Sequence, residues 1–406
     1  MGFPDGFWWG TTASSAQTEG SAPRSDLRRW EEAGRLPPSG DGNGFAHRFA
    51  EDLALYAEHG LTHHRLTLEW ARLEPEQGRH DPAAVEHYRQ VLTAGGDAGV
   101  SMWAGLHHGS LPGWFADDLG GFVDPTGRSL HWARHVDWVA ETFGDLVHGW
   151  APIDDPVAYA SDGWLTGAMP PGRSDPGLFA EALEAVHLAD HQAWRLLRSG
   201  DQPVMSTMGL APLVPGVRDG DDPREGPAAA ATCDVVDDVV WRSWIRAQRD
   251  GVLAVPGRAA IELDDLAGAF DVIGVSYVGA RQVFHDGAVG PYPADAQRDD
   301  AGVAIWPEGL SLVLRRLADE LPGRALCVAG CGLGTADDHL RARYLDECIG
   351  RVGEAVDDGI DVRGFFHRTG IDGDGWAHGS DVRSGLFDVD RQGGEAAATA
   401  RRWATA

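Results

Sequence analysis

Two adjacent carboxyl groups, Asp154 and Asp155, end the apolar stretch VHGWAPIDD and precede a proline. A carboxyl that is poorly solvated, or that lies beside a second carboxyl, has a raised pKa, as a general acid requires. Asp155 is therefore the first candidate for proton transfer, with Asp154 and His108 expected beside it. The alternative interpretation is that Asp155 is only a polar residue of a pocket.

Glu69 is the second candidate carboxylate, because Arg65, Thr67 and Glu69 alternate along one apolar stretch. The alternative is a structural salt bridge from Glu69 to Arg72 or Arg368.

Further ionisable residues end other apolar stretches, among them the pairs His107–His108 and His367–Arg368. Side chains of adjacent strand residues diverge, so at most one member of each pair can serve one centre. We expect no metal and no cofactor.

These residues need a scaffold that brings their stretches together. Short runs rich in aromatic and β-branched residues alternate with segments of helical period over the whole chain, as in HHRLTLEW followed by PAAVEHYRQVLTAGGDAG. This alternation predicts the α/β class and a single (β/α)8 TIM barrel over residues 1–406. Residues 215–238 are interpreted as a long surface loop.

Catalytic residues of such a barrel lie at the carboxyl ends of its strands. The residues that end the apolar runs are therefore the candidate site, and the ligand-binding candidates among them are Gln17, Arg65, His107, Tyr277, His367 and Arg368.

The composition restricts the partners. The net charge is −28, so nucleic acid and anionic membrane surfaces are not expected to bind. All 34 basic residues are arginine, which excludes a lysine Schiff base. Four cysteines form no CxxC pair, and the N-terminus lacks a signal-peptide pattern. We expect a cytoplasmic protein with a small-molecule ligand, and the sequence predicts no particular oligomeric state.

Taken together, these segments resemble glycoside hydrolase family 1, the β-glucosidase-like retaining enzymes. The resemblance begins at FPDGFWWGTTASSAQTEG and ends at GSDVRSGLFDVD. Between them the matching motifs are RLTLEWARLEP, LHHGSLPGWF, GWLTGAMPPG, VIGVSY, GVAIWPEGL and DVRGFFHRTGIDGDGWAHG. The resemblance implies a (β/α)8 barrel and two catalytic glutamates, which in retaining enzymes lie about 5–5.5 Å apart.

Both glutamate positions depart from the family pattern. The acid/base glutamate corresponds to Asp155, whose carboxyl is one methylene shorter and so lies about 1.5 Å further back. The nucleophile corresponds to Gly330, which has no side chain to attack with. Cys331 follows it, but neighbouring strand residues face opposite ways and thiolate formation needs an electropositive setting. We interpret Cys331 as a core residue.

The resemblance also assigns ligand contacts. Gln17 and His108 match residues that hydrogen-bond the sugar, and Trp376 matches an aromatic stacking residue. Arg65 matches the arginine that pairs with the nucleophile. Four other contact positions are changed, and they hold Asp154, Val278, Gly375 and Arg368.

The predicted function follows from these losses. Each unpaired buried polar group costs about 1–3 kcal/mol, so specific glucoside binding should be weakened. We predict a repurposed enzyme, for example of a biosynthetic pathway, that performs acid/base chemistry on a small glycosylated or polyhydroxylated molecule. The alternatives are a weakly active β-glycosidase that uses Asp155 and a non-catalytic ligand-binding protein.

Overall fold

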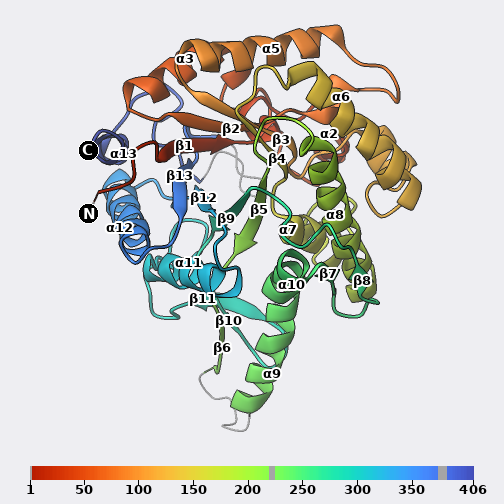
Figure 1. The fold of residues 1–406 in the computed structure, drawn as a ribbon, viewed down its shortest axis with the longest axis vertical. Coiled ribbons are helices and arrows are strands. Elements are labelled where there is room, and N and C mark those ends of the chain that lie inside the picture. The colour runs from red at the N-terminus through yellow and green to blue at the C-terminus, as the bar shows by residue number, and fades with distance from the viewer. Residues whose placement is uncertain (1, 219–224, 374–381) are drawn as a thin grey trace.

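The computed structural model describes residues 2–218, 225–373 and 382–406. Eight parallel strands form one sheet that curves into a barrel, and helices surround it (Figure 1). This confirms the predicted (β/α)8 architecture. The barrel strands are β1 (Trp8–Ala13), β2 (His63–Thr67), β3 (Ser101–His107), β4 (Gly149–Ile153), β5 (Met205–Leu210), β9 (Val272–Tyr277), β12 (Leu326–Cys331) and β13 (Val362–Arg368).

The strand order is β4-β3-β2-β1-β13-β12-β9-β5, so β4 and β5 must meet to close the barrel. They do so through isolated bridges rather than a full ladder. The Trp150 amide donates to the Pro203 carbonyl at 2.9 Å, and the Asp155 amide donates to the Thr207 carbonyl at 2.9 Å. The backbone of Asp155, a candidate site residue, thus forms one of the hydrogen bonds that close the barrel between β4 and β5.

The longer helices lie outside the barrel and cover the sheet with their apolar faces. Several begin where the sequence places an aspartate before a proline, as at Asp81–Pro82 and Asp175–Pro176, because the aspartate caps free amides and proline suits the first turn. These helices are α3 (Phe45–Glu58), α5 (Pro82–Asp97), α6 (Ala133–Phe143), α8 (Pro176–Leu197), α10 (Ser243–Asp250), α11 (Glu308–Glu320), α12 (Asp338–Asp357) and α13 (Glu395–Ala404).

A small apolar cluster fills the barrel interior below the site. It contains Trp103, Met205 and Phe366, all fully buried. Gly149 allows the Trp103 ring to fit, since a Cβ there would lie 2.4 Å from the ring. This part of the barrel interior is therefore filled by side chains.

Short elements follow the strands or extend from the barrel. One expectation is wrong: residues 215–238 are not all loop, because α9 (Glu225–Asp237) occupies much of this segment. Four consecutive alanines, the best helix formers, explain the helix.

The other short elements are α1 (Ser15–Thr18), α2 (Asp26–Glu32), α4 (Trp70–Leu73), α7 (Pro156–Ala160), β6 (Leu213–Pro215), β7 (Val252–Leu253), β8 (Ile261–Glu262), β10 (Ala280–Val283), β11 (Val289–Tyr292) and the π-helical turns η1 (Trp114–Asp118), η2 (Gly127–Trp132), η3 (Ser161–Leu165) and η4 (Asp238–Arg242).

No helix within residues 2–218, 225–373 and 382–406 is both long and apolar enough to cross a bilayer.

Candidate active site

A cavity of about 240 Å³ opens where the carboxyl ends of the barrel strands converge. This volume is below the roughly 300–1,000 Å³ of pockets for drug-sized ligands, so the cavity suits a small molecule. Its chemically informative lining residues are Gln17, Arg65, His108, Asp154, Asp155, Ser276, Gly330 and Arg368. The structure thus brings together most of the candidates predicted from the sequence.

Arg65 and Asp154 form a buried ion pair at the floor of this cavity. The guanidinium Nη1 lies 2.6 Å from Asp154 Oδ2, and the two side chains are 7% and 9% exposed. A second nitrogen of Arg65 donates to the Ala329 carbonyl at 3.3 Å, and His108 Nε2 lies 3.8 Å from Asp154 Oδ2. Burial alone would raise the pKa of Asp154, but attraction to the nearby cations, chiefly Arg65, together with the hydrogen bond from Arg65, outweighs it and lowers that pKa.

Asp155 has the opposite electrostatic character. Its backbone is left-handed, with φ 45° and ψ 74°, and its Oδ1 accepts the Ala158 amide at 3.1 Å to cap α7. Gly209 leaves room for this carboxyl, because a Cβ there would lie 1.9 Å from Asp155 Oδ2. Burial, with a smaller contribution from the Asp154 charge, raises the pKa of Asp155 to about 6. Two adjacent carboxyls thus differ: Asp154 is held ionised and Asp155 can exchange a proton near neutrality.

Gly330 lies in close contact with the Ser276 hydroxyl, so that a side chain there would require the hydroxyl to move. A Cβ at Gly330 would lie 2.9 Å from Ser276 Oγ, which itself lines the cavity. The next residue, Cys331, is 1% exposed, and its Sγ faces the Tyr344 hydroxyl at 4.0 Å in the surrounding core. The Cys331 thiol is therefore a core group and does not line the cavity.

Glu69 is not among the residues that line the cavity. Its carboxylate accepts the hydroxyls of Ser15 at 2.9 Å and Ser110 at 3.1 Å, and it caps α4 through the Ala71 amide. Arg72 instead donates to the carbonyls of Glu19 and Gly20. Burial raises the pKa of Glu69, but these contacts give the carboxylate a structural role.

Three other predicted ligand-binding residues are turned away from the cavity. His107 packs edge-on against Tyr159, and its Nδ1 lies 3.2 Å from the Ser110 carbonyl. His367 Nδ1 lies 2.9 Å from the Thr369 carbonyl, and the Tyr277 hydroxyl donates to the Trp306 carbonyl at 2.6 Å. Burial lowers the pKa of both histidines to about 3, so each is neutral at pH 7.

Gln17 and Arg368 do line the cavity. Gln17 Oε1 accepts the Ser14 hydroxyl at 2.9 Å, which orients the amide. Trp376 and Gly375 lie outside the described residues. In the described part of the chain, no three histidine, cysteine, aspartate or glutamate side chains are grouped so that they could hold a metal ion.

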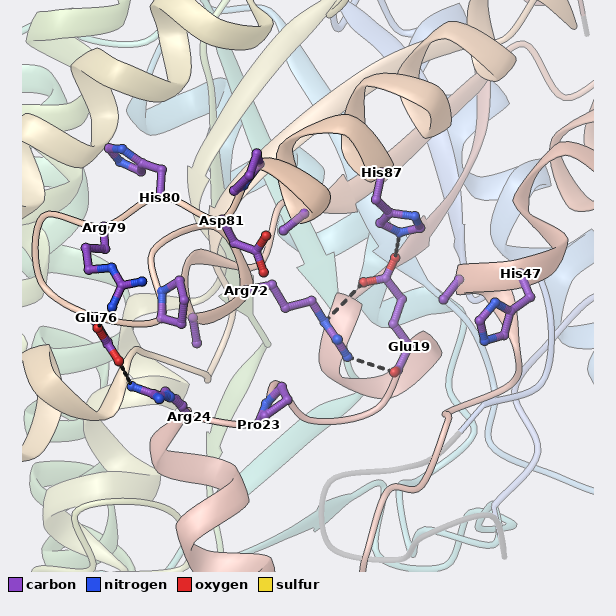
Figure 2. A pocket seen from close by; sticks show the side chains of 15 residues that line it. Glu19, Pro23, Arg24, His47, Arg72, Glu76, Arg79, His80, Asp81 and His87 are labelled. Carbon is purple, nitrogen blue, oxygen red and sulfur yellow. Dashed lines mark hydrogen bonds and ion pairs between the residues drawn. The ribbon is translucent and has the colours of Figure 1, made fainter.

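A larger cavity of about 740 Å³ lies beside α4 and α5, and none of its lining residues belongs to a barrel strand (Figure 2). Its charged groups are paired with one another. Arg72 and His87 converge on the buried Glu19, with His87 Nε2 3.0 Å from the carboxylate. Arg24 and Arg79 both bind Glu76. Because these charged groups are paired with one another, they are less available to bind a ligand. The cavity at the strand ends, lined by Gln17, Arg65, Asp155 and Arg368 among others, is the better candidate site, and we call it the barrel-end cavity.

The fold and the site together define a (β/α)8 barrel of the glycosidase type, with carboxyl groups at its strand ends. The family model for glycosyl hydrolase family 1 matches residues 1–215 and 265–405, so the chain belongs to that family.

Among its relatives, thermostable beta-glucosidase B from Thermobispora bispora is 27% identical over 96% of this chain and 87% of the relative. Cyanidin 3-O-glucoside 7-O-glucosyltransferase (acyl-glucose) from Delphinium grandiflorum is 25% identical over 96% of this chain and 86% of the relative. Among solved structures, a beta-glycosidase from Pyrococcus horikoshii superposes with a TM-score of 0.89 at 25% identity, covering 99% of this chain and 95% of that one.

Proposed function

We propose that this family 1 barrel is an enzyme that uses a single acid/base carboxyl, Asp155, on a small polyhydroxylated or glycosylated molecule. The observation that carries the proposal is the contrast between the two carboxyls of the cavity. Asp155 has a pKa raised to about 6, whereas Arg65 holds Asp154 ionised. One group that exchanges a proton near neutral pH, beside one fixed charge, suits general acid/base catalysis.

The same geometry argues against the retaining two-carboxylate reaction. That reaction needs a carboxylate nucleophile close to the acid. At the corresponding strand end the cavity is lined by Gly330 and the Ser276 hydroxyl. We therefore propose that no covalent sugar intermediate forms, and that Asp155 gives its proton directly to a leaving oxygen or takes one from an attacking hydroxyl.

Two kinds of reaction remain compatible with one such carboxyl. Transfer of a group to a second substrate is supported by the relative from Delphinium, which is named a glucosyltransferase. Weak β-glycoside hydrolysis is supported by the relatives named beta-glucosidases, such as that from Thermobispora. A non-catalytic binding protein is the outcome if no conversion depends on Asp155.

Aryl β-glycosides at high protein concentration test the hydrolytic alternative. We expect the parent and Asp155→Ala to release phenol at the same background rate, and neither to gain the mass of a sugar. Hydrolysis by the parent that Asp155→Ala lacks, with such an adduct in the parent, would contradict the proposal and identify a retaining glycosidase.

A mass-spectrometric screen of glycosides, polyols and activated glycosyl donors tests the catalytic part. We expect at least one compound to be converted by the parent and about 10²–10⁴-fold more slowly by Asp155→Asn. Where Asp155 acts as the acid, the rate should fall as the pH rises above about 6, because the carboxyl then loses its proton. If no conversion depends on Asp155, the catalytic proposal fails.

A further inference from the structure

The two arginines of the barrel-end cavity are in different electrostatic situations. Arg65 is neutralised by Asp154 at 2.6 Å. Arg368, at the end of β13, lines the same cavity and is exposed, and its guanidinium has no hydrogen bond or ion pair with any residue in the described ranges. Its charge is nevertheless close enough to act on the lining, because it contributes to lowering the pKa of both Asp154 and His108.

None of the other ionisable groups that line the cavity within the described residues forms an ion pair with this cation. His108 is neutral at pH 7, because burial and the nearby arginines lower its pKa despite the attraction of Asp154. The carboxyl of Asp154 is already engaged by Arg65. Among the described residues that line the cavity, the other carboxyl is that of Asp155, and it caps α7 instead of contacting Arg368. A cation in this arrangement is unusual in a chain with a net charge of −28.

Hydroxyl groups complete the lining near Arg368. Thr12 is its register partner on β1 and lines the cavity. Ser276, which is in close contact with Gly330, also lines the cavity. A guanidinium binds carboxylates and phosphates through two parallel hydrogen bonds, and hydroxyls donate to the remaining anionic oxygens. The cavity therefore combines a donor set for an anion with polar groups for hydroxyls.

We propose that the ligand of the barrel-end cavity is an anionic, polyhydroxylated molecule whose carboxylate or phosphate binds Arg368. This inference rests on the proposed function in that both concern one cavity, but it assigns a binding role and not a chemical step. It names the substrate class: a sugar-sized acid or phosphate ester rather than a neutral glucoside.

The arginines of the cavity beside α4 and α5 (Figure 2) can be compared with Arg368. This cavity holds more arginines, but Arg24 and Arg79 share the carboxylate of Glu76, and Arg72 is bound by Glu19 and by the Gly20 carbonyl. An arginine that is already paired gains little from an added anion. Arg24→Gln is therefore a matched control: it removes an exposed arginine from a cavity rim without altering the barrel-end site.

Titration calorimetry at pH 7 tests the inference with three probes: D-glucose, D-glucuronate and D-glucose 6-phosphate. In the parent and in Arg24→Gln, we expect at least one anionic probe to bind about 10-fold or more tightly than glucose. This factor corresponds to about 1.4 kcal/mol, which is in the range of one charge-assisted hydrogen bond. In Arg368→Gln, the preference should fall to about the level of glucose.

The two anionic probes distinguish a carboxylate from a phosphate ligand. Equal binding of glucose and the anions by the parent, no binding of either anion, or an unchanged preference in Arg368→Gln would each overturn the inference. Repeating the titrations with Asp155→Asn separates this inference from the proposed function. An anion preference that persists there, in a protein without Asp155-dependent turnover, would support the anion site while the catalytic proposal fails.

Discussion

Replacing Asp154 by alanine is expected to destabilise the protein by about 3–5 kcal/mol, because it leaves the buried Arg65 guanidinium without its counter-charge. The two side chains are 7% and 9% exposed, so water cannot replace the lost partner efficiently. Replacing Arg65 by methionine should cost less, since an isolated Asp154 can take up a proton. Urea denaturation at pH 7 measures both changes.

The double variant Arg65→Met/Asp154→Ala measures the interaction energy between the two side chains, which the single variants cannot isolate. Because it removes both charges, it should be more stable than the sum of the single effects predicts, with a coupling energy of about 0.5–3 kcal/mol. Arg24→Met breaks an exposed ion pair and should change stability by less than about 1 kcal/mol. Additive single effects would show that the Arg65–Asp154 pair contributes no mutual stabilisation.

Asp155→Asn is expected to stabilise the folded protein by about 2–3 kcal/mol at pH 8. Burial raises the pKa of Asp155 from 3.8 to about 6, and each pKa unit corresponds to about 1.4 kcal/mol. The folded state binds this proton more tightly than the unfolded state. The cost of ionising Asp155 is therefore absent below about pH 4, grows between pH 4 and 6, and is complete above pH 6. Asparagine avoids it and can still cap α7.

Denaturation of the parent and Asp155→Asn from pH 4 to 8 checks this expectation, which concerns the difference between the two proteins at each pH. Asp337→Asn is the matched control, because Asp337 caps α12 through the Leu340 amide on the exposed surface. It makes the same exchange at a helix cap outside the cavity. If Asp155→Asn were destabilising at every pH, the carboxylate would be stabilised by contacts other than the cap.

The barrel and the strand ends that form the site could be predicted because the apolar runs and helical segments alternate along the whole chain. The sequence could not decide which member of each adjacent pair faces the ligand. In the structure His108, Ser276, Gly330 and Arg368 line the cavity, while their neighbours His107, Tyr277, Cys331 and His367 do not. Side chains alternate along a strand, so a shift of one residue in the expected strand exchanges the two sets.

Two further differences have local causes. Asp154 and Asp155 both line the cavity, against the alternation, because the left-handed backbone of Asp155 turns the chain at the end of β4. Glu69 lies just beyond the end of β2, where it caps α4, so the alternation from Arg65 and Thr67 does not extend to it. Sequence patterns describe regular strands, and these residues lie where the strands end.

The backbone hydrogen bonds between β4 and β5 restrict how this protein can be redesigned. The peptide that carries Asp154 and Asp155 also joins the first and last strands of the sheet order, through the Asp155 amide and the Thr207 carbonyl. Lengthening the segment by one residue would shift this bond and open the barrel wall. New chemistry at this position must therefore come from exchanging side chains, with the length of the chain kept constant.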